Sequence, residues 1–447
     1  MPSIRSRSVP SGSYLVSAAN RERLEAHLGT CVGVTLCDRH TGVGGLIHLL
    51  LPEPTGIDRR WRPECYATTG LPLFVKALHD LGASMSRLEA CVAGGGLVGP
   101  METDDVGFDL GGRTLEAVER ALDREGIPIR QSETGGCLGY CMSLDLFTWR
   151  TEIRPIGFQP ESALPNSEKR PSRPSEKSIA SVRPIPQVAL KILRMIREQK
   201  LNLLDVAHEI REDQILTARV IRLCNSSLFG LRGHVDSIDR ALVLLGERRL
   251  LQLVVSASLE GFYPEHEQGY SLCKGGLYKH ALGTAMVTQE LAQFTGRAST
   301  DVAYTAGLLH DIGKVVLDQY VAATYPLFYR RTQVDGVDLV DVERDTFGVT
   351  HTRIGGRLAE QWSLPSDLTD AIRCHHRPEE ASVAPELTHL VYLADLLMSR
   401  FLAGQLLERS NTRRFAIRLK RIGLTPSQLP ILVDLIPRSV FVTAVPG

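Results

Sequence analysis

A stretch rich in proline and serine, residues 159 to 181, divides this 447-residue chain into two parts of different texture. It holds four prolines, repeated serines and charges of both signs. Such a composition cannot bury a hydrophobic core, so we expect an extended flexible linker. The whole chain is too long for one ordinary core. The sequence therefore predicts a multidomain protein with four consecutive segments: 1–158, the linker 159–181, 182–400, and a C-terminal helical extension over 401–447.

The two main parts differ in the spacing of their apolar residues. Before the linker, short apolar runs alternate with glycine-rich turns and with helical patterns over 71–81 and 113–125, which predicts an α+β domain. After the linker, apolar residues recur at the spacing of one helix face, which predicts an all-α domain. The helices expected first in that domain cover 187–199, 205–210, 214–225, 238–244 and 248–259.

Charge and cysteine content narrow the functional class. Lysine plus arginine and aspartate plus glutamate are equal at 51 each, so we expect no nucleic-acid partner and no anionic-membrane footprint. No apolar run approaches the roughly 18–20 residues of a membrane span, so we expect no membrane insertion. The first residues lack the apolar core of a secretory signal. Nine scattered cysteines without a CxxC pair fit free thiols, and we expect a cytoplasmic location.

Cys31 and His48 form the first candidate site. Apolar runs over 32–36 and 46–51 flank a turn-like segment, 38–42, which predicts a β-hairpin. The hairpin would return the chain and bring His48 beside Cys31. An imidazole next to a thiol is the minimum apparatus of nucleophilic catalysis, although a buried Cys and a buried His are individually common core residues. The run Gly94–Gly96 predicts a tight turn beside this site, because no Lys-Ser/Thr follows it as in a phosphate loop.

The motifs around these two residues resemble a known family. They are Gly29-Thr30-Cys31-Val32-Gly33-Val34, Gly44-Gly45-Leu46-Ile47-His48-Leu49-Leu50-Leu51-Pro52, Tyr66-Ala67-Thr68-Thr69-Gly70-Leu71-Pro72, Cys91-Val92-Ala93-Gly94-Gly95-Gly96 and Gly135-Gly136-Cys137-Leu138-Gly139-Tyr140. In this order they resemble the CheD family of chemoreceptor glutamine deamidases. The family usually carries a hydroxyl residue five or six positions before the cysteine, where this chain has Ala26 and Glu25.

The resemblance implies an enzyme of chemotaxis, a protein-glutamine glutaminase that deamidates receptor glutamines. Cys31 would be its nucleophile and His48 its general base. Backbone N–H groups after Cys31, at a helix start, are expected to form the oxyanion hole. We expect no cofactor in this half. The expected partners are methyl-accepting chemoreceptors, and a CheC-type phosphatase is a further candidate.

The second half resembles the HDOD domain, a helical module related to metal-dependent HD phosphohydrolases. The resemblance rests on Ile185-Pro186-Gln187-Val188-Ala189-Leu190, on residues 216–230 and on residues 238–246. Leu308-Leu309-His310-Asp311-Ile312-Gly313-Lys314 also resembles the HD signature. Imidazoles and carboxylates are ligands for Fe, Mn, Zn or Ni, so we expect a divalent metal site. Its candidate ligands are His280, His310, Asp311, His351, His375, His376 and Asp395.

Three functional interpretations remain open at this point. The favoured one is a signalling protein with a deamidase half and an HDOD regulatory half. In the second, both halves are non-catalytic binding modules, as HDOD domains generally are. In the third, the HDOD half is a metal-dependent phosphohydrolase; hydrolysis of cyclic-di-GMP is disfavoured, because Arg377-Pro378-Glu379 replaces the Gly-Tyr-Pro element expected after the double histidine.

Overall fold

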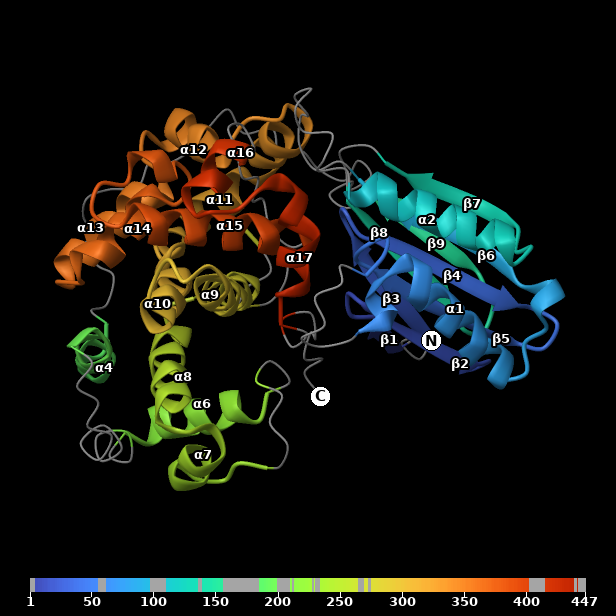
Figure 1. The fold of residues 1–447 in the computed structure, drawn as a ribbon, viewed down its shortest axis with the longest axis horizontal. Helices are drawn as coiled ribbons and strands as arrows, with labels where there is room; N and C mark the ends of the chain where they lie inside the picture. The colour runs from blue at the N-terminus through green and yellow to red at the C-terminus, as the bar shows by residue number, and fades with distance from the viewer. Residues whose placement is uncertain are drawn as a thin grey trace.

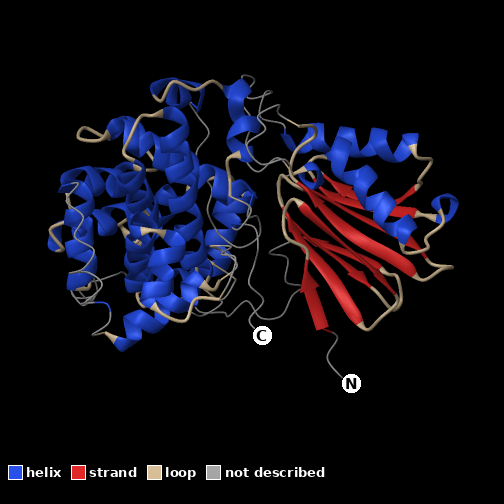
Figure 2. Cartoon of the chain, turned by 60° about the horizontal axis from the view of Figure 1, so that its bottom comes forward, coloured by secondary structure: helices blue, strands red, loops and turns tan. Residues whose placement is uncertain are grey.

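The computed structural model of the protein describes residues 5–54, 62–96, 110–135, 139–155, 185–198, 210, 213–226, 229, 234–263, 269–271, 275–401, 415–437 and 440. Among them, every strand lies before residue 156, and only helices and turns follow residue 184 (Figure 2). The predicted α+β first half and all-α second half are thus confirmed. The predicted linker, 159–181, lies outside the described residues, so its boundaries stay a prediction.

The first half contains two sheets. One sheet has the order β1-β3-β8-β9 and the other β2-β5-β4-β6-β7. The strands are β1 (Arg5–Ser8), β2 (Ser13–Ala18), β3 (Glu22–Leu28), β4 (Val32–Asp38), β5 (Val43–Leu49), β6 (Glu89–Gly94), β7 (Ile129–Thr134), β8 (Tyr140–Asp145) and β9 (Thr151–Pro155). The helical elements are η1 (Pro63–Cys65), α1 (Ala67–Asp80), η2 (Met85–Arg87) and α2 (Leu110–Arg124).

Strands β4 and β5 are buried on both faces, which explains their nearly continuous apolar sequences. On one face, Val34 and Ile47 pack against α1 and α2, in a core that includes Phe74. On the other face, Leu46 packs with Met142 and other residues of the four-stranded sheet. Helices, five-stranded sheet and four-stranded sheet therefore form three layers.

The predicted hairpin around the first candidate site is confirmed. Strands β4 and β5 pair antiparallel, with Val32 opposite Leu49 and Asp38 opposite Val43. The buried carboxylate of Asp38 accepts hydrogen bonds from the backbone N–H groups of His40 and Ser84 and from the guanidinium of Arg87. Burial alone would raise the pKa of Asp38, yet these hydrogen bonds outweigh it and hold that pKa well below its usual range. The turn end of the hairpin is thereby fixed.

The second half is built around α9 (Gly276–Thr295), which packs against α10 (Thr300–Leu309) and α15 (Pro385–Phe401). The other helices before α15 are α4 (Gln187–Glu198), α6 (Gln214–Cys224), α7 (Ile238–Leu245), α8 (Glu247–Glu260), α11 (Lys314–Tyr329), the π-helical turn η4 (Arg330–Val334), α12 (Leu339–Phe347), α13 (His351–Gln361), α14 (Ser366–Cys374) and η5 (Pro378–Glu380). After α15 come α16 (Phe415–Arg421), η6 (Pro426–Gln428) and α17 (Leu429–Asp434).

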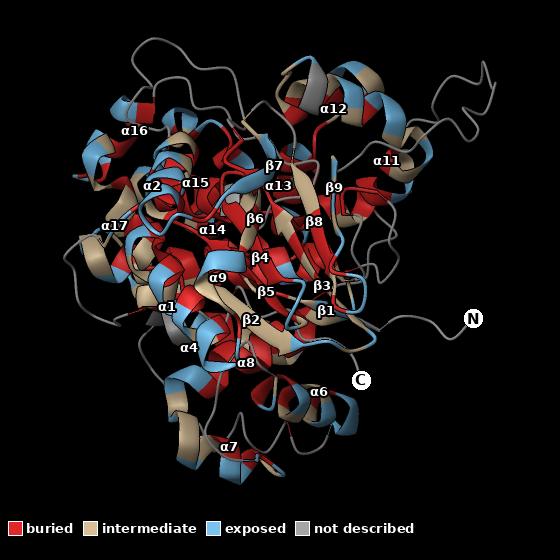
Figure 3. Cartoon of the chain, turned by 90° about the vertical axis from the view of Figure 1, so that its right-hand side faces the viewer, coloured by how far each residue is buried: buried red, intermediate tan, exposed pale blue. Residues whose placement is uncertain are grey.

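Most of the predicted helices of this half match the observed elements closely. The ranges 187–199, 214–225, 238–244 and 248–259 correspond to α4, α6, α7 and α8. The range 205–210 falls almost wholly outside the described residues. Buried residues fill the interior of both halves, whereas the peripheral helix α7 is mostly exposed or intermediate (Figure 3). None of the helices in the described parts of the chain combines the length and apolar character that a membrane crossing needs.

The two halves meet where α17 approaches the sheet domain (Figure 1). The phenolic O–H of Tyr66, which directly precedes α1, donates to the carboxylate of Asp434 at the end of α17, with distances of 2.6 and 2.7 Å to its two oxygens. One continuous buried cluster contains Cys31, Leu50 and Tyr66 of the first half together with Leu432 of α17. The C-terminal extension therefore joins the cores of both halves.

Candidate functional sites

All seven predicted metal ligands converge in the helical half, although they come from separate elements. His280 lies in α9 and Asp395 in α15, whereas His310 and Asp311 directly follow α10. The remaining three are His351, the first residue of α13, and the pair His375 and His376, which follows α14. All seven are buried. Five of the seven thus lie at helix ends, where a side chain can turn into the interior without disturbing helix packing.

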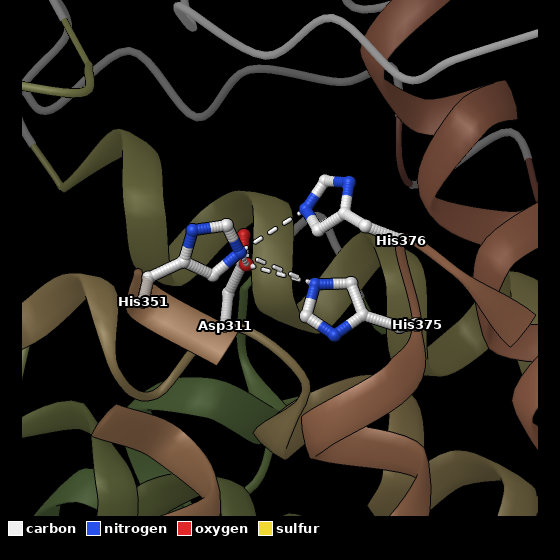
Figure 4. A group of neighbouring side chains, drawn as sticks. All are labelled: Asp311, His351, His375 and His376. Atoms are coloured by element: carbon white, nitrogen blue, oxygen red, sulfur yellow. Dashed lines mark hydrogen bonds and ion pairs between the residues drawn. The ribbon is translucent and has the colours of Figure 1, made fainter. Parts of the chain in front are cut away.

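Asp311 lies between two groups of histidines. Its Oδ2 is 3.6 Å from His280 Nε2 and 3.3 Å from His310 Nε2. Its Oδ1 is 3.4 Å from His351 Nε2 and 3.5 Å from His375 Nε2. Figure 4 shows the imidazoles of the second group turned toward this carboxylate. The carboxylate therefore has one oxygen available to each group.

The remaining two residues complete these groups. Asp395 Oδ1 lies 3.0 Å from His280 Nε2 and 3.7 Å from His310 Nε2. His376 Nε2 lies 3.1 Å from His351 Nε2 in the other group (Figure 4). The arrangement is thus a pair of adjacent sites, His280–His310–Asp395 and Asp311–His351–His375–His376, with ligand atoms within 4.8 Å of one another in each.

Hydrogen bonds orient three of the imidazoles so that Nε2 faces the cluster. Nδ1 of His310 lies 2.7 Å from the carbonyl oxygen of Gly307, and Nδ1 of His375 lies 2.9 Å from that of Ile372. A carbonyl only accepts, so each of these Nδ1 atoms carries the proton. Nδ1 of His351 lies 2.8 and 2.9 Å from the two carboxylate oxygens of Glu343. Such outer hydrogen bonds are the usual way to fix a metal-binding imidazole.

The donor set fits a divalent metal. His310 Nε2 and Asp311 Oδ1 are buried and have no hydrogen-bond partner among the described residues, and both atoms face the cluster. Burial lowers the pKa values of His280, His375 and His376, to about 4 for His375, which keeps these imidazoles neutral. Neutral imidazole is the form that binds metal. Burial opposes protonation of His310 too, but Asp311 and Asp395 outweigh it and raise that pKa to about 10.

Lys314 is the feature of this cluster that was not predicted as part of the site. Its buried Nζ donates to Asp311 Oδ2 at 2.6 Å. The ammonium partly neutralises the negative charge of the Asp311 carboxylate. It also places a hydrogen-bond donor beside that carboxylate. The sequence did contain a signal, because Lys314 ends the His310-to-Lys314 motif. Glu343, by contrast, lies outside every quoted motif.

Cys31 lies just before β4, in a bend that the Gly94–Gly96 run holds in place. The backbone N–H of Gly95 donates to the carbonyl of Cys31 at 2.9 Å. Gly94 has a φ of +100°, and a Cβ at this position would collide with the same carbonyl oxygen. Only glycine fits there, so this glycine run lies beside the cysteine, at the end of β6, whereas the predicted tight turn stays a prediction. The expected helix start after Cys31 is wrong: β4 begins there, because a run of branched apolar residues favours a strand.

His48 lies in β5 of the hairpin, and Cys31 lies in the bend just before β4. His48 lies opposite Gly33, and Cys31 lies two residues before Gly33. No hydrogen bond joins the Cys31 thiol to the His48 imidazole, although both residues are described. The hairpin therefore brings the backbones of the two residues to the same end of β4 and β5, while their side chains are not hydrogen-bonded to each other.

The His48 imidazole is buried and neutral. Its Nδ1 lies 3.3 Å from the carbonyl oxygen of Val9, which assigns the proton to Nδ1. Its Nε2 lies 3.3 Å from Oγ of Ser11 and can accept the hydroxyl proton. Burial lowers the pKa of His48 to about 4, because the imidazolium is poorly solvated there. At neutral pH the ring is therefore unprotonated at Nε2, and the lone pair of that atom faces the Ser11 hydroxyl.

The Cys31 thiol is protonated in this conformation. Only 1% of Cys31 is exposed, and burial raises the pKa of its thiol to about 12. The nearby Cys65 adds to this rise, whereas the backbone N–H of Cys31 itself opposes it. A thiolate would thus form only when the site opens or when substrate binding moves the proton to His48.

The comparisons with known proteins identify the first half. The family model described as CheD chemotactic sensory transduction matches residues 50–155. A probable chemoreceptor glutamine deamidase CheD of Pyrococcus abyssi (strain GE5 / Orsay) is 38% identical over 146 residues, 32% of this chain and 88% of that protein. The same-named protein of Desulforamulus reducens is 36% identical over 144 residues, 32% of this chain and 87% of that protein. The chain belongs to the CheD family.

Behind its CheD half, the chain carries an HDOD domain. The HDOD family model matches residues 182–378. A solved structure with a similar chain path is an HDOD domain protein of unknown function from Geobacter sulfurreducens, 23% identical, with a TM-score of 0.48, which covers 57% of this chain and 89% of that one. Both halves of the predicted resemblance are therefore confirmed.

A hydroxyl lies beside His48 in this CheD half, but it comes from a different position than the one the family uses. Glu25, six residues before Cys31, contacts Ser6, His27 and Cys141 on the other sheet. The hydroxyl next to His48 belongs instead to Ser11, in the bend before β2. Motif comparison cannot find Ser11, because the pairing of β2 with β5, in which Ser13 lies opposite His48, brings it to His48 from 37 residues away.

Proposed function

We propose that the CheD half deamidates glutamine side chains of chemoreceptors, with Cys31 as nucleophile and His48 as general base. The observations that support this most are that Cys31 directly precedes β4, that His48 pairs with Gly33 of the same strand, and that the buried His48 imidazole is neutral. The membership of the CheD family supplies the substrate class, since the similar proteins are described as chemoreceptor glutamine deamidases.

The reaction follows from the chemistry of a thiol and a neutral imidazole. His48 Nε2 accepts the Cys31 proton as sulfur attacks the carboxamide carbon, and a tetrahedral oxyanion forms. The imidazolium returns that proton to the nitrogen, and ammonia leaves to give a thioester. His48 then takes a proton from water as the water oxygen attacks the thioester. Collapse of this second intermediate releases the glutamate side chain and restores the thiol.

Ser11 orients the base. Its hydroxyl lies 3.3 Å from Nε2 and 3.5 Å from Nδ1, and the Val9 carbonyl lies 3.3 Å from Nδ1, so both groups restrain the ring. With Nδ1 protonated, Nε2 is the only atom that can accept the thiol proton. We assign to Ser11 the positioning role that the family's upstream hydroxyl residue would have.

In the HDOD half we propose a pair of divalent metal ions held by the seven converging residues. The first ion would be held by His280, His310 and Asp395, the second by His351, His375 and His376, with Asp311 reaching both. When bound, such ions polarise phosphoryl oxygens and lower the pKa of water. The orphaned atoms His310 Nε2 and Asp311 Oδ1 favour this site.

We assign the HDOD half a regulatory role. The alternative, phosphodiester hydrolysis, requires a substrate path to a cluster whose seven residues are all buried. A CheC-type phosphatase remains a proposed partner of the CheD half. A reducing, cytoplasmic setting suits the chemistry, and the seven cysteines that the structure describes are all free.

Mass spectrometry of a chemoreceptor cytoplasmic fragment incubated with the full chain tests the deamidase proposal. Each glutamine converted gains about 1 Da, because OH replaces NH2. Cys31→Ser should lower the rate at least about 1000-fold, since an alcohol without a strong base is a far weaker nucleophile. The matched control is Cys65→Ser, which removes the neighbouring thiol. Equal rates for Cys31→Ser and the wild type would refute the assignment of the nucleophile.

A further inference from the structure

We propose that the surface formed by Arg62 and Tyr66 is the docking surface for the receptor segment, and that α17 occupies it when the protein is closed. This inference rests on the proposed deamidase function and names how its substrate reaches the site. The contact itself is specific: the Tyr66 hydroxyl donates to Asp434 at 2.6 and 2.7 Å from the two carboxylate oxygens. Arg62 Nη2 donates to the backbone carbonyl of Asp434 at 3.4 Å.

This surface is structurally continuous with the cysteine. Tyr66 forms a β-bridge with Leu51, directly after β5, and the N–H of Leu50 donates to the carbonyl of Cys65 at 2.9 Å. Cys65 is close enough to Cys31 to raise the pKa of its thiol. Leu50, Leu51, Cys65 and Tyr66 all belong, with Cys31, to one buried cluster. A segment bound at Tyr66 therefore lies at the border of the Cys31 site.

The occupant shows what kind of partner the surface accepts. Helix α17 presents Leu429, Leu432 and Val433 as buried apolar residues and ends on the carboxylate of Asp434. Arg62 is only 8% exposed, and its Nη1 has no hydrogen-bond partner among the described residues. A buried guanidinium with an unused donor favours a second acceptor from an incoming chain. The surface fits a helical segment with apolar residues and an adjacent carboxylate.

The closed position is anchored in the HDOD half as well. Val440 lies against Gly283, where a Cβ would come 3.2 Å from its Cγ1 and would also collide with Met398. Gly283 is one turn beyond His280 in α9, and Met398 is one turn beyond Asp395 in α15. Asp434 thus contacts the CheD half, and Val440, six residues later, contacts the two helices of the His280–Asp395 pair. Receptor docking requires that the segment that carries Asp434 leave the Tyr66 surface.

Labelling of Cys31 in the full chain tests the proposal. Limiting iodoacetamide should label Cys31 slowly in the wild type, because labelling requires opening. Asp434→Ala removes the acceptor of Tyr66 and should raise the labelling rate about 10- to 100-fold, since hydrogen bonds to charged groups stabilise by that factor. Tyr66→Phe, a smaller change, should act in the same direction. The matched control is Asp345→Ala, which removes an acid paired with Arg331 inside the HDOD half.

Peptide-resolved mass spectrometry gives internal references for this experiment. The half-buried Cys91 and the buried Cys224 should label at wild-type rates in Asp434→Ala. A rise at Cys224 would mean general unfolding and would overturn the proposal, as would an unchanged rate at Cys31. Asp434→Ala should also bind the receptor cytoplasmic fragment about 10- to 100-fold more tightly, because the competitor is gone. Unchanged affinity would overturn the shared surface.

The outcomes separate this inference from the deamidase proposal. If Asp434→Ala labels faster and binds the receptor fragment more tightly, the shared surface stands even when no glutamine is converted. If Asp434→Ala converts receptor glutamines but its Cys31 is labelled at the wild-type rate, the deamidase proposal is supported and the shared surface is not. The docking proposal and the deamidase proposal can therefore be refuted independently of each other.

Discussion

The two candidate sites of this chain are built in opposite ways. Cys31 and His48 are brought together by one hairpin, whose register is fixed by adjacent strands. The seven-residue cluster draws on α9, α13 and α15 and on the ends of α10 and α14, and the separation from His280 to Asp395 spans most of the HDOD half. A site made by a local element persists as long as its sheet persists. The geometry of a site made by several helices changes whenever the arrangement of those helices changes.

This difference suits the roles proposed for the two halves. The proposed catalytic pair needs fixed geometry, and both Cys31 and His48 are buried. A regulatory module needs an equilibrium between arrangements that a ligand can shift. Metal ions or other ligands at the junction of α9 and α15 would act on helices that also contact the segment carrying Asp434.

The largest effect is expected at the base of the local site. His48→Ala should lower the deamidation rate about 10²- to 10⁴-fold, the usual contribution of a positioned general base. His40→Ala, in the exposed turn of the same hairpin, should leave the rate unchanged. The rate is followed by the 1 Da mass gain of the receptor fragment. Equal losses in both variants would show that the hairpin fold, and not the imidazole, is responsible.

Acid should weaken the CheD half through the same residue. The pKa of His48 is about 4 in the folded chain and about 6.5 when unfolded, so the unfolded state binds the proton first as pH falls. The stability contributed by the neutral ring is complete above about pH 6.5 and declines toward pH 4, by about 3 kcal/mol in total. Hydrogen exchange of β4 and β5 amides, corrected for intrinsic rates, measures this decline.

The His48→Gln variant separates the contribution of His48 to the pH dependence of stability from that of the other histidines. His48→Gln cannot bind the proton, so its protection in β4 and β5 should change less between pH 7 and pH 5 than that of the wild type. Parallel pH profiles for the two proteins would contradict the burial argument for His48.

Sequence patterns reached the local site more completely than the distributed one. Two short apolar runs and the turn residues between them predicted the β4–β5 hairpin, which is observed; that His48 lies beside Cys31 stays a prediction. For the HDOD half, residue type and motif pointed to the seven ligands, but their grouping around Asp311 depends on helix packing. Helix periodicity predicts which face of a helix is buried, but it does not predict which other helix packs against that face.

Other features were beyond sequence reasoning for the same reason. Ser11 reaches His48 through sheet pairing, and Glu343 reaches His351 from a separate helix. Arg418 is only 6% exposed: it lies over the ring of Tyr392 at 4.5 Å and pairs with Glu379. A basic residue becomes buried when the fold supplies an aromatic face and a carboxylate together.

The distributed site should respond to a change outside its ligands. Glu343→Gln keeps an oxygen near His351 but removes the charge that accepts from Nδ1, and such outer changes typically lower metal affinity about 10- to 100-fold. Metal content of purified protein, measured for Mn, Fe, Ni and Zn during chelator competition, gives the readout. Glu360→Gln, whose acid pairs with Arg373 at the surface, is the matched control. Unchanged retention in Glu343→Gln would contradict the proposed ligand role of His351.

The smallest effect is expected at Ser11, and it returns to the local site. Ser11→Ala removes one hydroxyl 3.3 Å from His48 Nε2 and leaves the Val9 carbonyl in place. The ring keeps its tautomer but loses one restraint, so we expect about a tenfold lower kcat, near the 1 kcal/mol of one hydrogen bond, with KM unchanged. Ser11→Thr keeps the hydroxyl and should restore most of the rate, whereas a purely structural role would raise KM or lower stability in both variants.

Ser13→Ala, which removes a hydroxyl bonded to the carbonyl of Pro10, is the control for the same bend. If Ser11→Ala and Ser13→Ala behave alike, His48 is held by its strand alone.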